Sequence, residues 1–343
     1  MRAYEIVSGK GLDGLRRTER KLRAPDDHEV RLRMHAVSLN YRDLMITSGT
    51  YPITSEVAPI AVADGAGEVI AVGSRVTRFR VGDRVTGIYF SRWLDGDADP
   101  EKLAIVPGAS SDGFLADEAV MHEDFLVSTP DHLDFNEAAT LSCAGVTAWN
   151  ALFVEGRAKP GNTVLLLGTG GVSIWALKLA KAAGLRTIIT SSSDEKLERA
   201  RALGADIAIN YRTTPEWQDE VLRRTDGRGV DLVVEVGGHG TLNRSIAATR
   251  TSGIIVVIGG LNGFATEIEI MPLLVGAKRL AGIAVGSRSM FEDFVRFVTE
   301  RRIRPTIDRI FKFDQAREAY AYLETAQHFG KVVIEVAGTP AVH

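Results

Sequence analysis

The spacing of apolar residues changes after residue 130 and divides the chain into two parts. Before Pro130, short β-rich runs such as those at 29–39 and 65–73 are separated by glycine, proline and aspartate. This texture predicts a compact, mainly antiparallel domain. Residues 131–150 have a helical pattern. From Asn162 onward, short apolar strands alternate with longer helical segments, which predicts βαβ units with a parallel sheet.

Six apolar strands are expected in this second part, and they make one doubly wound sheet. The strands are predicted at 162–168, 186–191, 206–210, 230–238, 253–260 and 280–287, with helices starting near Val172, Asp194, Pro215, Thr241 and Pro272. In the strand order 3-2-1-4-5-6 the last of them lies at an open edge. The segments after Ser289 have no partner strand in this sheet, so we expect them to return to the first domain.

Composition narrows the class of protein. The 343 residues suffice for about two domains, and 45% hydrophobic and 25% charged residues are typical of globular chains. With 44 acidic and 41 basic residues, no basic surface for nucleic acid is expected. The single cysteine, Cys143, excludes an intramolecular disulfide and favours a reducing, cytoplasmic location. No signal peptide or membrane segment is predicted, because the longest apolar region, 164–177, contains glycines and ends before Lys178.

A glycine-rich turn joins the first predicted strand of the parallel sheet to its helix. The segment Gly168, Thr169, Gly170, Gly171 and Val172 has the spacing GxGxxS, with Ser173 at the position of the third glycine. Such a turn lets backbone amides and a helix N-terminus face a pyrophosphate. We therefore predict dinucleotide binding, with an ordinary strand-to-helix turn as the alternative.

The end of the second strand favours NADP(H) over NAD(H). NAD-specific folds place an acid there, whereas this chain has Ser191 and Ser192, with Lys196 available for a 2′-phosphate. Asp194 is the counter-evidence, although as the expected helix cap it would bind backbone amides. Tyr211 is expected at the adenosine end. The alternative for Lys196 is a solvated helix charge.

Several segments together resemble the medium-chain dehydrogenase/reductase superfamily, in its zinc-free, quinone-oxidoreductase-like branch. They are SLNYRDLM (38–45), DGAGEVIAVG (64–73), VGDRV (81–85), CAGVTAWNAL (143–152), the glycine-rich turn, ALGADIAIN (202–210) and FGKVVIEV (329–336). The resemblance implies a GroES-like domain, 1–129 completed by 287–343. It also implies a Rossmann NADP-binding domain, 130–286, inserted between them.

The resemblance also allows predictions about zinc binding and about the reaction that the protein catalyses. Zinc-dependent members hold zinc with two cysteines and a histidine, and the matching positions here are Asn40, Ala63 and Cys143. One ligand of three cannot hold zinc, so no metal is expected. Without a Lewis acid, hydride addition to a quinone or an α,β-unsaturated carbonyl is the easiest reaction, because the charge spreads onto an enolate. A zinc-free alcohol dehydrogenase or carbonyl reductase, and a non-catalytic NADPH-binding protein, remain alternatives.

Candidate substrate and proton-transfer residues lie in the first domain. The resemblance places Asn40, Tyr41 and Asp43 on a loop beside the nicotinamide and the substrate, with an Asn/Asp turn as the alternative. Tyr89 and Trp93 are expected as the wall and lid of a substrate pocket, or as a cover of the domain edge. Tyr51, Tyr89 and Asp64, together with water, are the candidate proton donors, and Tyr51 resembles a tyrosine beside the cleft of quinone reductases. The alternatives are that Tyr51 is a core aromatic residue and that Asp64 orients Asn40. His35 and His122 show no metal-ligand spacing.

Further cofactor contacts are expected where parallel strands end. They are Cys143 and Thr147 on the helix between the domains, then Gly237, Gly259, Gly260, Val285, Gly286, Ser287 and Lys331. For Lys331 a surface salt bridge is the alternative. The apolar stretch 264–276 is expected to cover the open sheet edge with a second chain as a homodimer; the alternative is that it packs on its own domain.

Overall fold

The computed structural model describes residues 1–55 and 57–336 and divides into two compact units. Unit 1 contains Met1–Val146 and the chain from Gly286 onward, and unit 2 is Thr147–Val285. Unit 1 thus reaches beyond the predicted boundary at 129/130, because the helical segment from Phe135 packs on strands of unit 1. Residues 337–343, which the prediction placed in the C-terminal part, lie outside the described residues.

Unit 1 is built on a mixed, mainly antiparallel sheet. Its strands neighbour one another in the order β14-β15-β3-β4-β5-β7, β6 also pairs with β3, and β1 and β2 form a separate antiparallel pair. The strands are β1 (Arg2–Ile6), β2 (Leu15–Glu19), β3 (Glu29–Leu39), β4 (Asp64–Val72), β5 (Arg84–Gly87), β6 (Glu118–His122), β7 (Leu126–Ser128), β14 (Ile307–Lys312) and β15 (Lys331–Glu335). The C-terminal strand β15 lies antiparallel to β3, with Ile334 opposite Val37, so the tail returns to the first domain as predicted.

The helices of unit 1 come from three stretches of the chain, 41–48, 135–145 and 288–324. They are α1 (Tyr41–Ser48), α2 (Phe135–Ala138), η3 (Leu141–Gly145), α9 (Arg288–Glu300) and α10 (Ala316–Glu324), with short 3-10 turns η1 (Gly11–Gly14), η2 (Glu123–Phe125) and η5 (Phe313–Gln315). The predicted helical run 131–150 is helical in separate pieces: α2, the π-helical turn η3, then α3 (Val146–Trp149) and η4 (Asn150–Val154).

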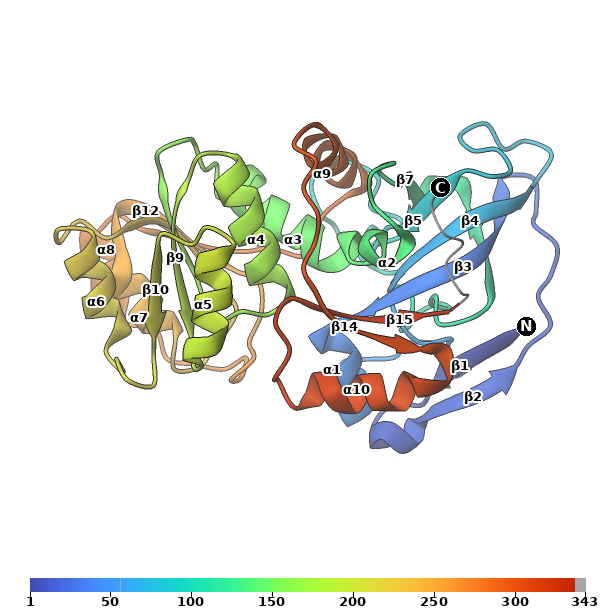
Figure 1. Cartoon of the computed structure of the whole chain (residues 1–343), viewed down its shortest axis with the longest axis horizontal. Helices are drawn as coiled ribbons and strands as arrows, with labels where there is room; N and C mark the ends of the chain where they lie inside the picture. The colour runs from blue at the N-terminus through green and yellow to red at the C-terminus, as the bar shows by residue number, and fades with distance from the viewer. Residues whose placement is uncertain (56, 337–343) are drawn as a thin grey trace. The chain divides into compact units, whose positions relative to one another are not determined.

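Unit 2 is a doubly wound parallel sheet with the strand order β10-β9-β8-β11-β12-β13, which confirms the order 3-2-1-4-5-6. Figure 1 labels β9, β10 and β12 of this sheet, with helices α4 and α5 beside them. Its strands are β8 (Thr163–Leu166), β9 (Arg186–Ser191), β10 (Ile207–Asn210), β11 (Val230–Glu235), β12 (Thr249–Val257) and β13 (Arg279–Gly282). Strand β11 is buried throughout, as expected for a parallel strand covered on both faces. Strand β13 ends at Gly282, before the predicted end at residue 287, and just beyond it the Ile283 amide donates to the Val257 carbonyl of β12 at 3.1 Å.

The helices of unit 2 begin close to the predicted positions. They are α4 (Gly171–Ala182), α5 (Asp194–Ala202), α6 (Trp217–Arg224), α7 (Leu242–Ala248) and α8 (Ile270–Val275). Helices α4 and α5 contact strands β8, β9 and β10, whereas α7 contacts β11 and β12. The first four helices bury apolar side chains against the sheet, but α8 contains no buried residue.

Candidate active site and cofactor site

The glycine-rich turn of unit 2 has the geometry that a dinucleotide requires. Gly168 has φ +72°, a conformation that favours glycine, and its amide donates to Thr190 Oγ1 at 3.3 Å. Helix α4 starts at Gly171, so the amides of its first turn have no partner within the helix. Ser173 is buried and its Oγ donates to the Leu167 carbonyl at 2.6 Å, which holds the helix close to the preceding strand. These residues fit a pyrophosphate at the helix N-terminus.

The end of β9 carries a serine run instead of an acid. Ser193 is the N-cap of α5 and accepts from the Lys196 amide at 3.3 Å, so the prediction that Asp194 is the cap was wrong. The Asp194 carboxylate instead accepts from Asn210 Nδ2 at 2.7 Å. The side chain of Tyr211 is exposed, and its backbone amide donates to the Ser191 carbonyl at 3.0 Å, which brings these two predicted cofactor residues together.

In unit 1, a group of side chains that we call the polar cluster lies where β3 ends: Asn40, Asp43, Asp64, Cys143 and Lys331. Asn40 is the N-cap of α1, and Asp43 Oδ2 accepts from its backbone amide at 2.8 Å. The expected loop is therefore wrong, because Tyr41 and Asp43 lie in the first turn of a helix. The short-range Asn/Asp bond is present as a helix cap.

Lys331 places an ammonium group inside the polar cluster. Lys331 is the first residue of β15, which lies next to β3. Its Nζ donates to the Leu39 carbonyl and to Asn40 Oδ1, both at 2.6 Å, and lies 3.9 Å from Asp64 Oδ2. Asn40 Nδ2 donates to Asp64 Oδ2 at 2.8 Å, so both ends of the amide are held. The surface salt bridge considered for Lys331 is wrong, since the residue is only 3% exposed.

Burial shapes the protonation of the polar cluster. It raises the pKa of the Asp64 carboxyl to about 6, although the Lys331 charge and the Asn40 hydrogen bond act in the opposite direction. Burial, with the negative charge of Asp64, raises the pKa of the Cys143 thiol. Cys143 is therefore a protonated thiol at neutral pH. Asp64 Oδ1 is buried and has no hydrogen-bond partner within the described part of the chain.

Two tyrosines and an arginine lie beside this cluster. The hydroxyls of Tyr51 and Tyr89 are 3.4 Å apart. The guanidinium carbon of Arg42 lies 5.0 Å from the ring centre of Tyr51 and 5.6 Å from that of Tyr89. Trp93 is not a lid, because it is buried and its indole donates to the Gly96 carbonyl at 2.8 Å. Tyr41, by contrast, is exposed.

The segments after β11 and β12 are held by buried contacts. The carboxylate of Glu235 accepts from the Gly237 amide at 2.7 Å, from Thr241 Oγ1 at 2.7 Å, and from Ser245 Oγ. Gly259 and Gly260 come shortly after the end of β12. A Cβ added to Gly260 would lie 2.7 Å from the Phe264 ring, so a larger residue there would require the ring to move. These contacts give the segments a defined backbone path.

The remaining predicted cofactor residues also have structural partners. Thr147 is buried, and the Val285 carbonyl accepts from Asn150 Nδ2 at 3.0 Å. Ser287 caps α9 by accepting from the Met290 amide at 3.2 Å. A Cβ on Gly286 would lie 2.6 Å from Val146 Cγ1, so only glycine fits there.

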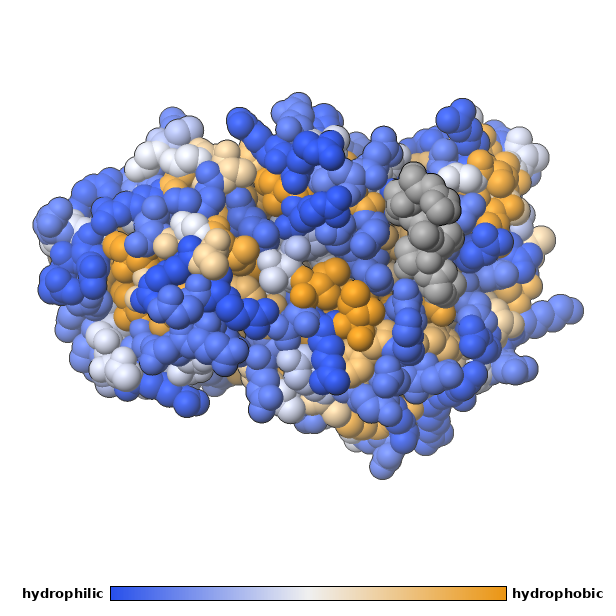
Figure 2. Space-filling view, in the orientation of Figure 1, coloured by the Kyte–Doolittle hydropathy of each residue, from blue (hydrophilic) through white to orange (hydrophobic). Residues whose placement is uncertain are grey.

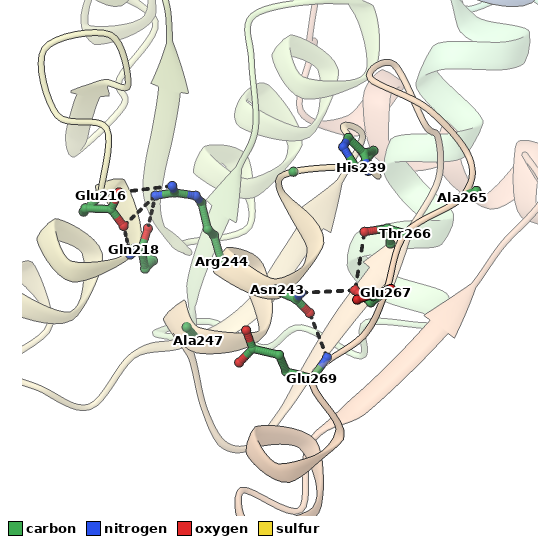
Figure 3. A pocket seen from close by; sticks show the side chains of 11 residues that line it. Glu216, Gln218, His239, Asn243, Arg244, Ala247, Ala265, Thr266, Glu267 and Glu269 are labelled. Atoms are coloured by element: carbon green, nitrogen blue, oxygen red, sulfur yellow. Dashed lines mark hydrogen bonds and ion pairs between the residues drawn. The ribbon is translucent and has the colours of Figure 1, made fainter.

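A polar groove of about 920 Å³ on unit 2 contains none of the predicted cofactor residues (Figure 3). Arg244 crosses one side and donates to Glu216, Gln218 and the Pro215 carbonyl. Asn243 binds the backbone of Glu267 and Glu269 on the other side. The cation that lines this groove, Arg244, is therefore already paired with Glu216.

None of the helices within residues 1–55 and 57–336 is long and apolar enough to cross a membrane. In the same part of the chain, no three His, Cys, Asp or Glu side chains gather in a way that could hold a metal ion.

Comparison with known proteins agrees with this architecture. Residues 26–131 match the alcohol dehydrogenase GroES-like domain, and residues 171–300 match the zinc-binding dehydrogenase family. A zinc-type alcohol dehydrogenase-like protein of Schizosaccharomyces pombe is 44% identical over 90% of this chain and 91% of its own. A quinone oxidoreductase of Pseudomonas aeruginosa is 31% identical, covering 90% and 92%. The chain belongs to the medium-chain dehydrogenase/reductase superfamily.

Solved structures of this superfamily have the same fold. The crystal structure of an NAD-dependent alcohol dehydrogenase matches with a TM-score of 0.90 and 32% identity, over 98% of this chain and all of the other. A quinone oxidoreductase of Pseudomonas syringae matches with a TM-score of 0.82 and 26% identity, over 98% and 99%. This medium-chain dehydrogenase/reductase is therefore a nicotinamide-dependent oxidoreductase of the alcohol dehydrogenase/quinone oxidoreductase type.

Two residues near the predicted sites were missed by sequence reasoning. Arg42 stands inside SLNYRDLM, yet a charged residue on an expected loop gave no reason to expect burial. Glu235 ends an apolar strand, and an acid at that position was a usable signal, because a buried carboxylate needs several donors.

Proposed function

We propose that this protein is an NADPH-dependent reductase that transfers hydride to a quinone or an α,β-unsaturated carbonyl without a metal. The observation that carries the proposal is the Lys331 ammonium, which contacts Asn40 at 2.6 Å in the polar cluster. An ammonium and an amide supply hydrogen bonds and positive charge but no open coordination position. Such groups can stabilise an enolate by hydrogen bonds and charge, whereas stabilising an alkoxide is a task for a bound metal.

The side chains at the three positions of the zinc ligands do not fit a zinc ion. Asn40 uses both ends of its amide on Lys331 and Asp64, and Ala63 has no ligand atom. Burial, with the charge of Asp64, raises the pKa of Cys143, whereas zinc requires a thiolate. A cation brought into this cluster would also lie next to the Lys331 ammonium.

NADPH is the proposed cofactor, and when bound it supplies the hydride. The backbone of Gly168, Gly170 and Gly171 would hold the pyrophosphate. Lys196 and Ser192 would meet the 2′-phosphate, because no acid stands at the end of β9 and Asp194 is bound to Asn210. The other proposed contacts are Asn40, Asp43, Cys143, Thr147, Thr169, Val172, Ser191, Tyr211, Gly237, Gly259, Gly260, Val285, Gly286, Ser287 and Lys331.

Proton delivery is assigned to Tyr51. Its side chain is partly exposed, whereas Tyr89 and Asp64 are buried, so Tyr51 Oη is the phenol that substrate reaches. A phenol protonates an enolate without a large change of its own pKa. Asp64 acts instead by accepting the hydrogen bond of Asn40 Nδ2, which orients the Asn40 amide. Asn40 and Tyr41 are proposed to border the substrate.

A homodimer is proposed through α8 and β13. Strand β13 ends the sheet order, and α8 exposes Ile270 by 70% and Val275 by 75%. Figure 2 shows a mainly hydrophilic face with a hydrophobic patch in the area that Figure 1 labels α8. An open strand edge with an apolar helix beside it is a pairing surface that a second copy would cover.

A substrate screen with metal analysis tests the proposed function. NADPH oxidation is followed with quinones, enones and aldehydes, and the zinc content of the same sample is measured. Turnover with quinones or enones at negligible zinc is the expected result. Preferred reduction of aldehydes would favour a carbonyl reductase, and NADPH binding by fluorescence without any turnover would favour a binding protein. One zinc per chain with activity lost to a chelator would overturn the proposal.

A further inference from the structure

We propose that Arg42 is a positioning residue for proton delivery, whose buried guanidinium holds positive charge against the linked phenols of Tyr51 and Tyr89. In this role Tyr51 Oη releases its proton to the reduced substrate more readily. The proposal rests on the proposed function for the identity of the proton acceptor. The contact between the guanidinium and the two phenols is independent of it.

The hydrogen bonds of Arg42 are incomplete in an unusual way. The residue is only 6% exposed, and its Nη1 donates to the Pro107 carbonyl at 3.1 Å and to Asp43 Oδ1 at 3.3 Å. Its Nε and Nη2 are buried and have no hydrogen-bond partner in residues 1–55 and 57–336. Two tyrosine ring faces lie there instead of acceptor oxygens. Burial removes water from the guanidinium, which is unfavourable for a charged group. Cation–π contacts with the two tyrosine rings offset part of this desolvation cost.

Asp43 pairs with Arg42 through one nitrogen only, Nη1, at 3.3 Å. Asp43 Oδ2 is engaged by the Asn40 amide, and the bond between Asp43 Oδ1 and Arg42 is long. Although burial opposes it, the groups around Arg42, Tyr89 and Asp43 foremost, raise the pKa of the guanidinium, so it stays charged. Burial raises the pKa of Tyr89, and the Arg42 charge acts against that increase.

The two phenols differ in access. Tyr51 is partly exposed and Tyr89 is 5% exposed, with 3.4 Å between their hydroxyls. After hydride reaches the substrate, the Tyr51 O–H bond breaks and its proton forms a new bond on the substrate anion. The tyrosinate left behind receives the Tyr89 O–H as a hydrogen bond and lies over the Arg42 cation. Water then returns a proton to Tyr51 from the exposed side.

Other titratable groups around this pair also enter its electrostatics. Asp43 is on α1 with Arg42, Cys143 comes from η3, and Tyr320 comes from α10. Cys143 is a neutral thiol, and burial raises the pKa of Tyr320 well above its usual value. Burial also raises the pKa of the Asp43 carboxyl, with the Arg42 charge acting against that increase. Among these groups Arg42 is the cation that contacts both phenol rings directly.

The spectroscopic test measures tyrosinate absorbance near 295 nm against pH for the wild type, Arg42→Met and Arg42→Lys. Subtracting the Tyr51→Phe curve on each background isolates Tyr51. The midpoint of Tyr51 should rise by about one pH unit in Arg42→Met, the size expected for loss of a cation at this range, and stay near wild type in Arg42→Lys. The matched control is Arg309→Met, which removes an exposed guanidinium 5.3 Å from the Tyr322 ring and should leave Tyr51 unchanged.

The kinetic test uses the pH profile of kcat. Proton delivery requires Tyr51 to carry its proton, so the alkaline limb of the profile should move upward by about one pH unit in Arg42→Met. The kcat value at neutral pH should fall about tenfold, with the KM for NADPH unchanged. A purely structural role would lower activity without moving the limb.

The outcomes separate this inference from the proposed function. A folded Arg42→Met protein with an unmoved Tyr51 midpoint overturns the role of Arg42, whatever the substrate is. Wild type without turnover on quinones and enones overturns the proposed function and leaves the absorbance titration to decide on Arg42. If Arg42→Met does not fold, Arg42→Gln replaces it: loss of the charge must raise the Tyr51 midpoint, and an unchanged midpoint overturns the role of Arg42.

Discussion

Replacing Lys331 by methionine should open the sheet of unit 1 locally, because it removes the cation from the polar cluster. The variant loses two hydrogen bonds of 2.6 Å, to the Leu39 carbonyl and to Asn40 Oδ1. It also leaves the fully buried Asp64 without the ammonium that lies 3.9 Å away. Methionine is similar in length, so little cavity is created. Removing one partner of a buried charged pair costs about 3 to 5 kcal/mol.

Hydrogen exchange locates this effect within the chain. Amides of β3 and β15 that exchange through local opening should exchange at least roughly 100-fold faster, since about 1.4 kcal/mol is tenfold. Peptides of β8 and β11 in unit 2 serve as the internal control. Adding Asp64→Asn to Lys331→Met removes the unpaired carboxylate and should recover part of the protection.

The pH dependence follows from Asp64. Burial raises its pKa to about 6 in the folded state, above the ordinary value of 3.8. The folded state therefore binds more protons within this window, and stability falls as pH rises through it. Without Lys331 the folded pKa is higher still, so the loss extends toward neutral pH. Less than tenfold faster exchange, an equal effect at pH 5 and pH 8, or no rescue by Asp64→Asn would refute the assigned cluster.

Three other predictions concern separate parts of the chain. NADPH should bind more tightly than NADH, and Lys196→Ala should cost about tenfold in NADPH affinity only; equal dissociation constants in the wild type would sink the phosphate assignment. Light scattering should give about twice the chain mass of 37.2 kDa, and acidic substitutions at Ile268 and Ile270 should lower it; a monomeric wild type rejects the dimer. His35 stacks on Phe135 at 4.0 Å, and burial lowers its pKa from 6.5, so the unfolded state binds more protons below that pH. Stability should thus fall as pH drops below 6.5, and His35→Leu should flatten that slope in chemical denaturation.

Local patterns predicted most of the fold, because strand and helix periodicities are properties of neighbouring residues. The run 29–39 became β3 with those bounds, and the alternation after Asn162 gave the strand order of unit 2. The cap of α5 was misplaced by one residue. Ser193 and Asp194 are both good caps, and the choice between them depends on Asn210, which binds Asp194 from another strand.

The candidate site was less predictable, because its contacts join distant segments. Lys331 meets Asn40 only because β15 pairs with β3 in one register, across 291 positions of the chain. Arg42 is buried because Pro107 and Tyr89 come from other segments to cover it. Sequence patterns indicate which residues are candidates for the site, but they do not predict which of these residues contact one another.

Metal-free hydride addition to a conjugated double bond is tested by following deuterium from the cofactor to the substrate. The protein is assayed with an enone and NADPH deuterated at C4 of the nicotinamide, and zinc is measured in the same sample. We predict deuterium at the β-carbon of a saturated ketone, with negligible zinc. Deuterium on the carbonyl carbon of an alcohol, or transfer that requires added zinc, would contradict the account.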